Sequence, residues 1–187
     1  MQDQVFILDE QNSNAECIEL ENIPVKGVVV EECRAQTACM LNEMWHSRLP
    51  NIHWSNVVRN THYVCYAIFY RQAVIGVAIW SSPVAQNRMK NGKETLELRR
   101  LALSDVCPKN TATRVLSMMV RLIRMKFPDI KKLVSYQDTD VHHGTIYKAA
   151  NWTMGGQVTF VDWSTDNRKR SATQSDANKI RWEYLLN

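Results

Sequence analysis

Alternation of apolar and polar side chains predicts three consecutive strands in the middle of the chain. Aromatic and β-branched residues fill 63–70 and 73–80, and two such runs separated by two residues are typical of a β-hairpin. Leucines then recur at every second position of 95–103, apart from a slip at Arg99 and Arg100. An extra residue in a strand produces such a slip, so the sequence predicts a β-bulge there.

Helical spacing of apolar residues predicts a long helix over 111–127, with one stripe facing the core. An earlier helix is expected over 32–47, with Leu41, Met44 and Trp45 on its buried stripe. The shorter segments are strands at 27–30, 133–136, 158–162 and 181–186 and a helix at 145–151. Helices between the later strands favour a parallel pair inside a mixed sheet, so the sequence predicts a single α/β domain.

The length of 187 residues suits one domain, and 45% of the residues are hydrophobic. Residues 1–16, polar apart from the apolar 5–8, are expected to form an acidic arm or an edge strand, and 17–187 the domain. No apolar run approaches the roughly 20 residues that span a membrane, and the acidic start lacks a secretory pattern. Five cysteines without a CxxC pair favour a reduced intracellular protein.

The net charge of +4 hides an uneven distribution along the chain. Residues 1–32 carry eight acidic side chains and one basic one, whereas 88–132 carry twelve basic and four acidic ones. The basic segment has two interpretations, which its charge alone does not separate. It is either a set of solvated faces or a surface for a phosphate-rich ligand.

A second candidate feature is the loop 104–110, between the third strand and the long helix. Backbone N–H groups at the start of a helix lack intrahelical acceptors and bind anions. Lys109, Asn110, Thr111 and Thr113 add further donors at this place. The alternative is that Thr111 is an ordinary N-cap of the helix.

The order strand, loop, helix, strand, helix in this part of the chain resembles the GNAT acyltransferase fold. The acyl-CoA loop of that family has the form [RQ]xxGx[GA], and 107–112 occupies its place, with Cys107 instead of Arg or Gln and Asn110 instead of Gly. Asn tolerates the positive φ of such a turn better than most residues. The segment Ile146–Trp152 is similar to the second GNAT signature, LYxKxGF.

Five blocks are also similar to the phage Mom-type proteins, which are divergent GNAT members. The blocks are Trp45–Pro50, Glu97–Leu103, Pro108–Thr113, Ser135–Asp138 and His143–Tyr147. This resemblance covers roughly residues 44–156. It implies a splayed parallel strand pair in the sheet, and an enzyme that modifies adenine N6 in phage DNA and so blocks host restriction. The ligands would be acetyl-CoA and double-stranded DNA, and the place of action the cytoplasm of the host bacterium.

Five residues are candidates for the chemistry: Tyr147, Asp138, Ser135, His46 and Arg100. On the resemblance, Tyr147 would protonate the leaving thiolate, with simple packing on the sheet as the alternative. Asp138 would accept a proton from the amine, with an Asx turn as the alternative. Ser135 would hydrogen-bond substrate or cofactor, and His46 would support a flipped adenine, with core packing as the alternative. Arg100 interrupts the apolar alternation, so it needs either a ligand or an acidic partner.

Binding residues follow from the resemblance and from the basic segment. Those expected to hold acetyl-CoA are Leu101, Ala102, Leu103, Lys109, Asn110, Thr111, Ala112 and Thr113. Those expected to contact DNA phosphates are Arg88, Lys90, Lys93 and Arg114. No His or Cys spacing matches a structural zinc site, so no metal ligands are predicted. A catalytic metal assembled from distant residues stays open.

Two other functions stay open at this point. The chain could be an acetyl-CoA-dependent N-acetyltransferase of a protein or a small amine. It could also be a GNAT-fold protein that binds nucleic acid without catalysis. The transferred group, acetyl or methylcarbamoyl, is not fixed by these residues, and neither is the oligomeric state.

Overall fold

The computed structural model describes residues 6–7, 27–45, 49, 51–84, 94–140, 142–158 and 178–186. The strands are β1 (Phe6–Ile7), β2 (Val28–Cys33), β3 (Tyr63–Tyr70), β4 (Ala73–Ser81), β5 (Thr95–Leu103), β6 (Lys132–Asp138), β7 (Thr153–Val158) and β8 (Lys179–Leu185). The helices are α1 (Ala35–Trp45), α2 (Trp54–Val58), α3 (Thr111–Lys126) and α4 (Thr145–Ala149). None of the described helices is long and apolar enough to cross a membrane.

One mixed sheet contains all the described strands, in the order β2-β3-β4-β5-β6-β8-β7, with β1 paired to β4. Among these strands, β5 and β6 are the parallel pair, and the other pairs are antiparallel. The parallel ladder runs from Thr95–Lys132 to Leu98–Ser135 and ends there, although both strands continue. The two strands therefore diverge beyond Leu98 and Ser135, which confirms the prediction of a splayed parallel pair.

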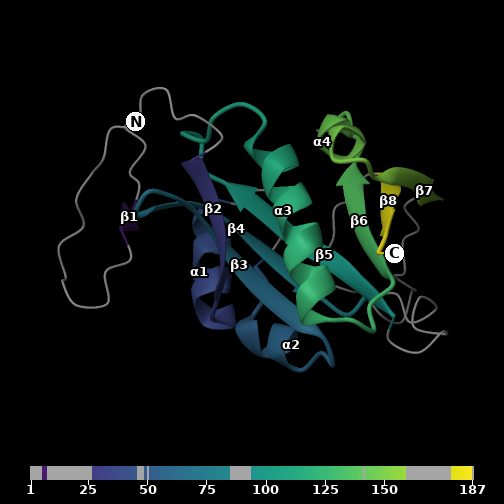
Figure 1. Cartoon of the computed structure of the whole chain (residues 1–187), viewed down its shortest axis with the longest axis horizontal. Coiled ribbons are helices and arrows are strands. Elements are labelled where there is room, and N and C mark those ends of the chain that lie inside the picture. Colours follow the sequence, from purple (N-terminus) through teal and green to yellow (C-terminus); the bar gives the residue numbers. More distant parts are fainter. Residues whose placement is uncertain are drawn as a thin grey trace, which may run out of the picture.

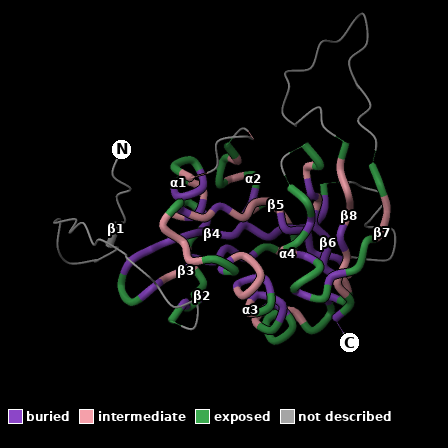
Figure 2. Tube along the Cα trace, turned by 90° about the horizontal axis from the view of Figure 1, so that it is seen from above, coloured by how far each residue is buried: buried purple, intermediate pink, exposed green. Residues whose placement is uncertain are grey.

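The helices cover the sheet from both sides (Figures 1 and 2). α3 lies on one face, where Leu116, Met119 and Ile123 are fully buried in the larger core. α1 and α2 lie side by side on the opposite face, over a smaller core that includes Ala38 and Val77. The two faces can therefore present different side chains at the point where β5 and β6 diverge.

A β-bulge interrupts β5 where the leucine pattern slips. Leu98 pairs with Trp80 and Arg100 pairs with Ile79, so Arg99 is the extra residue. Leu98 packs in the core under α3. Both arginines face the α1 side, since Arg99 donates to Ser81 and Arg100 lies close to Cys39 of α1. The predicted bulge is thus confirmed at the predicted residues.

The hairpin, the strand 95–103 and the long helix are confirmed within one residue. Three shorter predictions need correction. The first helix begins at Ala35, because Glu31, Glu32 and Cys33 continue β2 along β3. Its Met44 is 46% exposed, since small residues such as Ala35 and Ala38 face the sheet instead. Close packing on the sheet selects small side chains there, which a search for large apolar residues overlooks.

The strand predicted over 158–162 is displaced toward the N-terminus. β7 begins at Thr153 and pairs with β8, and Gly155 is the extra residue at a register shift between Met154 and Gly156. Residues 159–162 lie outside the described residues. The glycine pair marks an irregularity within a strand rather than the end of a helix. α2 has only one turn and no apolar periodicity, so the sequence pattern did not predict it.

Three cysteine side chains lie close to one another where α1 packs on the sheet. Cys33 and Cys65 face each other across β2 and β3, and Cys39 of α1 lies near both. Burial raises the pKa of the Cys33 thiol from 9.0 to about 12, and Glu32 and Cys39 add to the effect. Cys65 is 1% exposed, as expected for a small core residue.

Cys33→Ala should make the loss of stability at alkaline pH shallower. Because the pKa of Cys33 is higher in the folded state, the thiol loses its proton in the unfolded chain first as pH rises. The contribution of Cys33 to stability is therefore fully present below pH 9.0 and is lost as pH rises toward about 12. Removing the thiol removes its part of that slope. Urea unfolding measured at several pH values between these limits would detect the change. Val30→Ala serves as a control without a titrating group, and an unchanged slope in Cys33→Ala would contradict the assignment.

Candidate active site

The divergence of β5 and β6 opens a V-shaped gap in the sheet. Among the described strands, none pairs with β5 on this side beyond Leu98, so the main chain of 99–103 presents an unpaired edge. On its other side, the same stretch of β5 is paired with β4. Extended ligands with amide groups can bind such an edge in the manner of an added strand. Leu101, Ala102 and Leu103, predicted to hold a cofactor, lie on this edge.

Tyr147 and Ser135 meet at the narrow end of the gap. Ser135 belongs to the last paired position of the parallel ladder, opposite Leu98. The Tyr147 side chain comes from α4, and its Oη lies 2.8 Å from Ser135 Oγ. Both residues are buried, with 8% and 2% exposure. The structure therefore brings these two of the predicted catalytic residues into direct contact.

Two tryptophans enclose the ring of Tyr147. Trp182 of β8 stacks on it, with ring centroids 5.4 Å apart and planes at 12°. Trp152 meets it edge-on at 5.7 Å. This burial raises the pKa of Tyr147, and the hydrogen bond with Ser135 offsets part of the rise. The phenol is consequently neutral over the physiological range and able to donate its proton.

The buried side chain of Gln137 holds Trp182 in this position. Gln137 Oε1 accepts the indole N–H of Trp182 at 2.7 Å, and its Nε2 donates to the carbonyl of His142. The N-cap of α4 is Gly144, which has φ 71° and lies against both Gln137 and Trp182. Sequence reasoning missed Trp182 and Gln137, because only the pairing of β6 with β8 brings them beside Tyr147.

The two arginines of the bulge lie beside the gap on the α1 face of the sheet, opposite to the face that carries Tyr147. Arg99 Nη1 donates to Ser81 Oγ at 3.2 Å, and Arg99 Nε lies 3.5 Å from Glu97 Oε1. Burial and the neighbouring Arg99 lower the pKa of Arg100 to about 10, although Glu97 and Cys39 act in the other direction. The Arg100 guanidinium is still charged at neutral pH. Arg100 therefore lies near the gap, but on the face away from Tyr147.

Asp138 lies at the far end of β6. It lies three positions along the strand from Ser135, which corresponds to about 10 Å. Alternation places it on the opposite face of the sheet from Ser135. Its Oδ1 accepts the N–H of Asp140 at 2.9 Å, so the Asx turn that was the alternative interpretation is present. The structure does not bring Asp138 into contact with the pair formed by Tyr147 and Ser135.

The loop before α3 has the geometry of an anion site. Asn110 is the N-cap and takes φ 71°, the positive value expected for the residue that replaces glycine. The Thr111 hydroxyl and N–H both donate hydrogen bonds to the Pro108 carbonyl. In the described part of the chain, no main-chain acceptor is found for the N–H groups of Ala112 and Thr113. These two donors at the positive end of a helix dipole are free to bind a phosphate.

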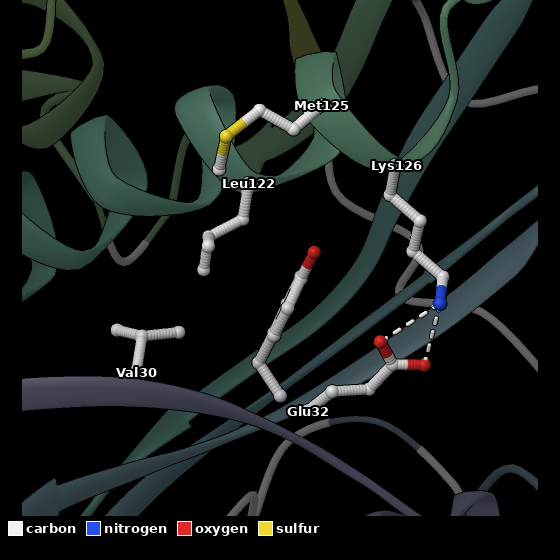
Figure 3. A pocket seen from close by; sticks show the side chains of 6 residues that line it. Val30, Glu32, Leu122, Met125 and Lys126 are labelled. Carbon is white, nitrogen blue, oxygen red and sulfur yellow. Dashed lines mark hydrogen bonds and ion pairs between the residues drawn. The ribbon is translucent and has the colours of Figure 1, made fainter.

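A hollow of about 280 Å³ continues from this loop along α3. Its lining consists of Asn110, Thr113, Arg114, Ser117, Met118 and Arg121. A second hollow of about 300 Å³ lies between β2 and α3, where the Glu32–Lys126 ion pair of 2.8 Å crosses its edge (Figure 3). Tyr66 lines that second hollow but is only 2% exposed, so it belongs to the core.

Four predicted residues, His46, Arg88, Lys90 and Lys93, lie outside the described residues. Within the ranges that are described, no cluster of His, Cys, Asp or Glu could hold a metal ion. Lys109 is exposed beside Asn110. The described site therefore consists of the edge of β5, the loop before α3 and the contact between Tyr147 and Ser135.

Comparison with known proteins gives one family and one curated relative. The model of the Mom protein family matches residues 27–185. The methylcarbamoylase mom of Escherichia phage Mu is 25% identical over 141 residues. That match covers 71% of this chain and 57% of the phage Mu protein, so the chain aligns with little more than half of that relative.

Several solved structures with the same fold are acetyltransferases. An IAA acetyltransferase from Bacillus cereus superposes with a TM-score of 0.58, at 14% identity, over 85% of this chain and 99% of that one. The ribosomal-protein-S18-alanine N-acetyltransferase from Escherichia coli gives 0.57 at 8% identity, over 84% and 93%. A GNAT acetyltransferase from Elizabethkingia anophelis, with acetyl-CoA bound, gives 0.54 at 13%, over 86% and 99%. The chain has the GNAT fold.

Proposed function

The chain belongs to the Mom protein family, and we propose that it is an acyltransferase that modifies adenine N6 in double-stranded DNA. The observation that carries the proposal is the contact between Tyr147 and Ser135 at the narrow end of the gap between β5 and β6. A neutral, buried phenol at this place can give its proton to a leaving thiolate. The relative from phage Mu, a methylcarbamoylase, supports a transfer of this kind.

Acetyl-CoA is the proposed co-substrate, and the described residues fit it. Its pyrophosphate would lie against the N–H groups of Ala112 and Thr113, and its extended arm along the unpaired edge of β5. The bound group would supply an activated acyl thioester. Leu101 and Leu103 would pack on the arm from the α3 side, where they already contact the core.

The adenine would approach from the α1 face. The reason is that Tyr147 and the loop before α3 lie on the α3 face of the sheet, which leaves the α1 face for the adenine. A gap between strands lets a group on one face react with a group on the other. Arg100 and Arg99 would then contact the acceptor nucleotide, and Asp138 and His46 are proposed near its path. Since adenine N6 is a weak nucleophile, positioning must supply much of the rate.

DNA affinity would come from basic side chains that contact phosphates. Arg88, Lys90 and Lys93 stand in the basic segment of the sequence. Arg114 and Arg121 line the hollow along α3, on the face opposite to α1, where they are proposed to contact CoA phosphates, DNA phosphates that extend past the edge of the sheet, or both. Such contacts release counterions, so binding should weaken steeply with salt. A base within a duplex must leave the stack to reach an enclosed site, which makes base flipping part of the proposal. Trp54, 38% exposed on α2, could stack on an extruded base.

Mass spectrometry of nucleosides tests this function. DNA from bacteria that express the chain should contain a heavier deoxyadenosine, which is absent when the Tyr147→Phe variant is expressed at the same level. The mass difference identifies the transferred group. Unmodified DNA at good expression, together with acetylation of a protein or a small amine by the purified chain, would replace the proposal with an ordinary N-acetyltransferase. Unmodified DNA together with salt-sensitive DNA binding would indicate a binding protein without catalysis.

Asn110 variants test the acetyl-CoA loop. Asn110→Val should weaken acetyl-CoA binding by about tenfold or more, because a β-branched residue at φ 71° distorts the loop that orients Ala112 and Thr113. Asn110→Gly keeps the backbone conformation and should bind as the parent does. Isothermal titration calorimetry with acetyl-CoA compares the two. Equal affinities in both variants would remove this loop from the binding site.

A further inference from the structure

We propose that Trp182 and Gln137 form a clamp that positions the ring of Tyr147 and keeps water away from its hydroxyl. The role of Tyr147 as proton donor rests on the proposed function, whereas the clamp itself rests on contacts among described residues. Trp182 covers the face of the ring, and Gln137 fixes Trp182. Neither residue is proposed to touch a substrate, so both are positioning residues.

The first part of the clamp is the stacking of the Trp182 indole on the Tyr147 ring. A distance of 5.4 Å between centroids and an angle of 12° mean that the indole and phenol rings overlap face to face with an offset. Trp182 stands directly opposite Ser135 in the β6–β8 pairing. The residue that covers the ring and the residue that hydrogen-bonds its hydroxyl are therefore held by a single cross-strand pair.

The amide of Gln137 accounts for the second half. Gln137 is 4% exposed, and both ends of its amide are engaged, one by the Trp182 indole and the other by the His142 carbonyl. The indole can rotate away only if it breaks the 2.7 Å hydrogen bond and leaves two buried polar groups without partners. The same amide ties down the segment that leads into α4, which carries Tyr147. Gln137 thus fixes both partners of the stack at once.

Burial is the main reason why the pKa of Tyr147 is raised, and Trp182 is one of the side chains that cover its ring. The charged and titratable side chains on the surrounding elements are Arg114, Arg121, Arg124 and Lys126 on α3, Lys148 on α4, Lys132, Tyr136 and Asp138 on β6, and Lys179, Arg181, Glu183 and Tyr184 on β8. None of these is a cause of the Tyr147 shift, which comes from burial and from Ser135. Water that enters beside Trp182 should therefore bring the pKa of Tyr147 down.

Titration of Tyr147 in the free protein tests the clamp without any transfer reaction. The ultraviolet absorbance of tyrosinate is followed with pH, and the Tyr147→Phe curve is subtracted to isolate Tyr147. Trp182→Leu should lower the pKa of Tyr147 the most, because the ring then loses its aromatic cover. Trp182→Phe keeps a ring on Tyr147 but loses the N–H, and Gln137→Met loses the acceptor, so both should give smaller shifts in the same direction. Ile123→Ala removes a buried side chain on α3, which carries neither part of the clamp, and should leave the titration unchanged.

Activity provides the second readout. If the proposed transfer occurs, the alkaline limit of kcat should move down in the Trp182 and Gln137 variants by the same amount as the Tyr147 titration. A titration that moves in variants of a chain without transferase activity would keep the clamp and remove the proposed function. Folded Trp182→Phe and Gln137→Met variants with the parent titration curve would overturn the clamp, even if Trp182→Leu fails to fold.

Discussion

Tyr147→Phe is expected to lower the rate of group transfer by about 100-fold or more, while the protein keeps its fold. Proton donation to a leaving group contributes about 10²–10⁴ in rate, and phenylalanine cannot donate. The aromatic ring remains between Trp182 and Trp152, so the packing of the site is preserved. The measurement is kcat for acetyl-CoA consumption with double-stranded DNA as acceptor, with thermal unfolding of both proteins as the check on folding.

Ser135→Ala is the matched variant for this prediction. It removes the hydroxyl that lies 2.8 Å from Tyr147 Oη, and it leaves the phenol in place. Since that hydrogen bond lowers the pKa of Tyr147, its loss should raise the pKa further and reduce kcat less than Tyr147→Phe does. A Tyr147→Phe variant with full activity would mean that the leaving thiolate takes its proton from elsewhere. Tyr147 would then be a packing residue.

Gly144→Ala is expected to give the largest loss of stability, about 3 kcal/mol. A side chain at φ 71° costs about 1 kcal/mol. A Cβ atom at this position would also lie 2.5 Å from Gln137 Oε1 and 2.6 Å from Trp182 Cζ2, and such overpacking costs about 1–3 kcal/mol. Neither neighbour can yield without breaking the hydrogen bond between them. The free energy of unfolding in urea measures the effect.

Asn110→Ala, compared with Asn110→Gly, provides the control for Gly144→Ala. Both residues are helix N-caps with almost the same backbone angles, φ 71° and ψ 6° at Asn110 and φ 71° and ψ 9° at Gly144. The difference between Asn110→Gly and Asn110→Ala should therefore report the backbone cost of Gly→Ala alone, about 1 kcal/mol. The loss in Gly144→Ala beyond this cost isolates the contact with Gln137 and Trp182. Equal losses at the two positions would mean that this contact can relax, contrary to the close packing described.

The sequence predicted most of the sheet, because its signals are local. The slip at Arg99 and the positive φ of Asn110 follow from side-chain order and residue type, and both are confirmed. The family and the GNAT fold were predicted from short motifs and are confirmed by the family match and by the acetyltransferase structures. The assignments of catalytic and binding roles remain predictions.

The rest depended on contacts between distant residues. Trp182 lies 35 positions from Tyr147 in the sequence, and no periodicity shows that β8 runs beside β6. Gln137 looks like an ordinary strand residue until its two partners are known. For Asp138, the local Asx turn could be predicted from the sequence. Its distance from Tyr147 could not, because that distance depends on the packing of α4 against β6. Asn42, fully buried on α1, likewise gave no signal in the sequence.

The extra residue in β5 has a consequence for how this strand can change by insertion and deletion. Leu96 and Leu98 before the bulge, and Leu101 and Leu103 after it, all pack toward α3. If Arg99 were deleted, Arg100 would point toward α1 and Leu101 toward α3 in plain alternation. A strand one residue shorter would therefore bury the same leucines on the same side. The core does not require the additional arginine, and selection on folding alone would not retain it.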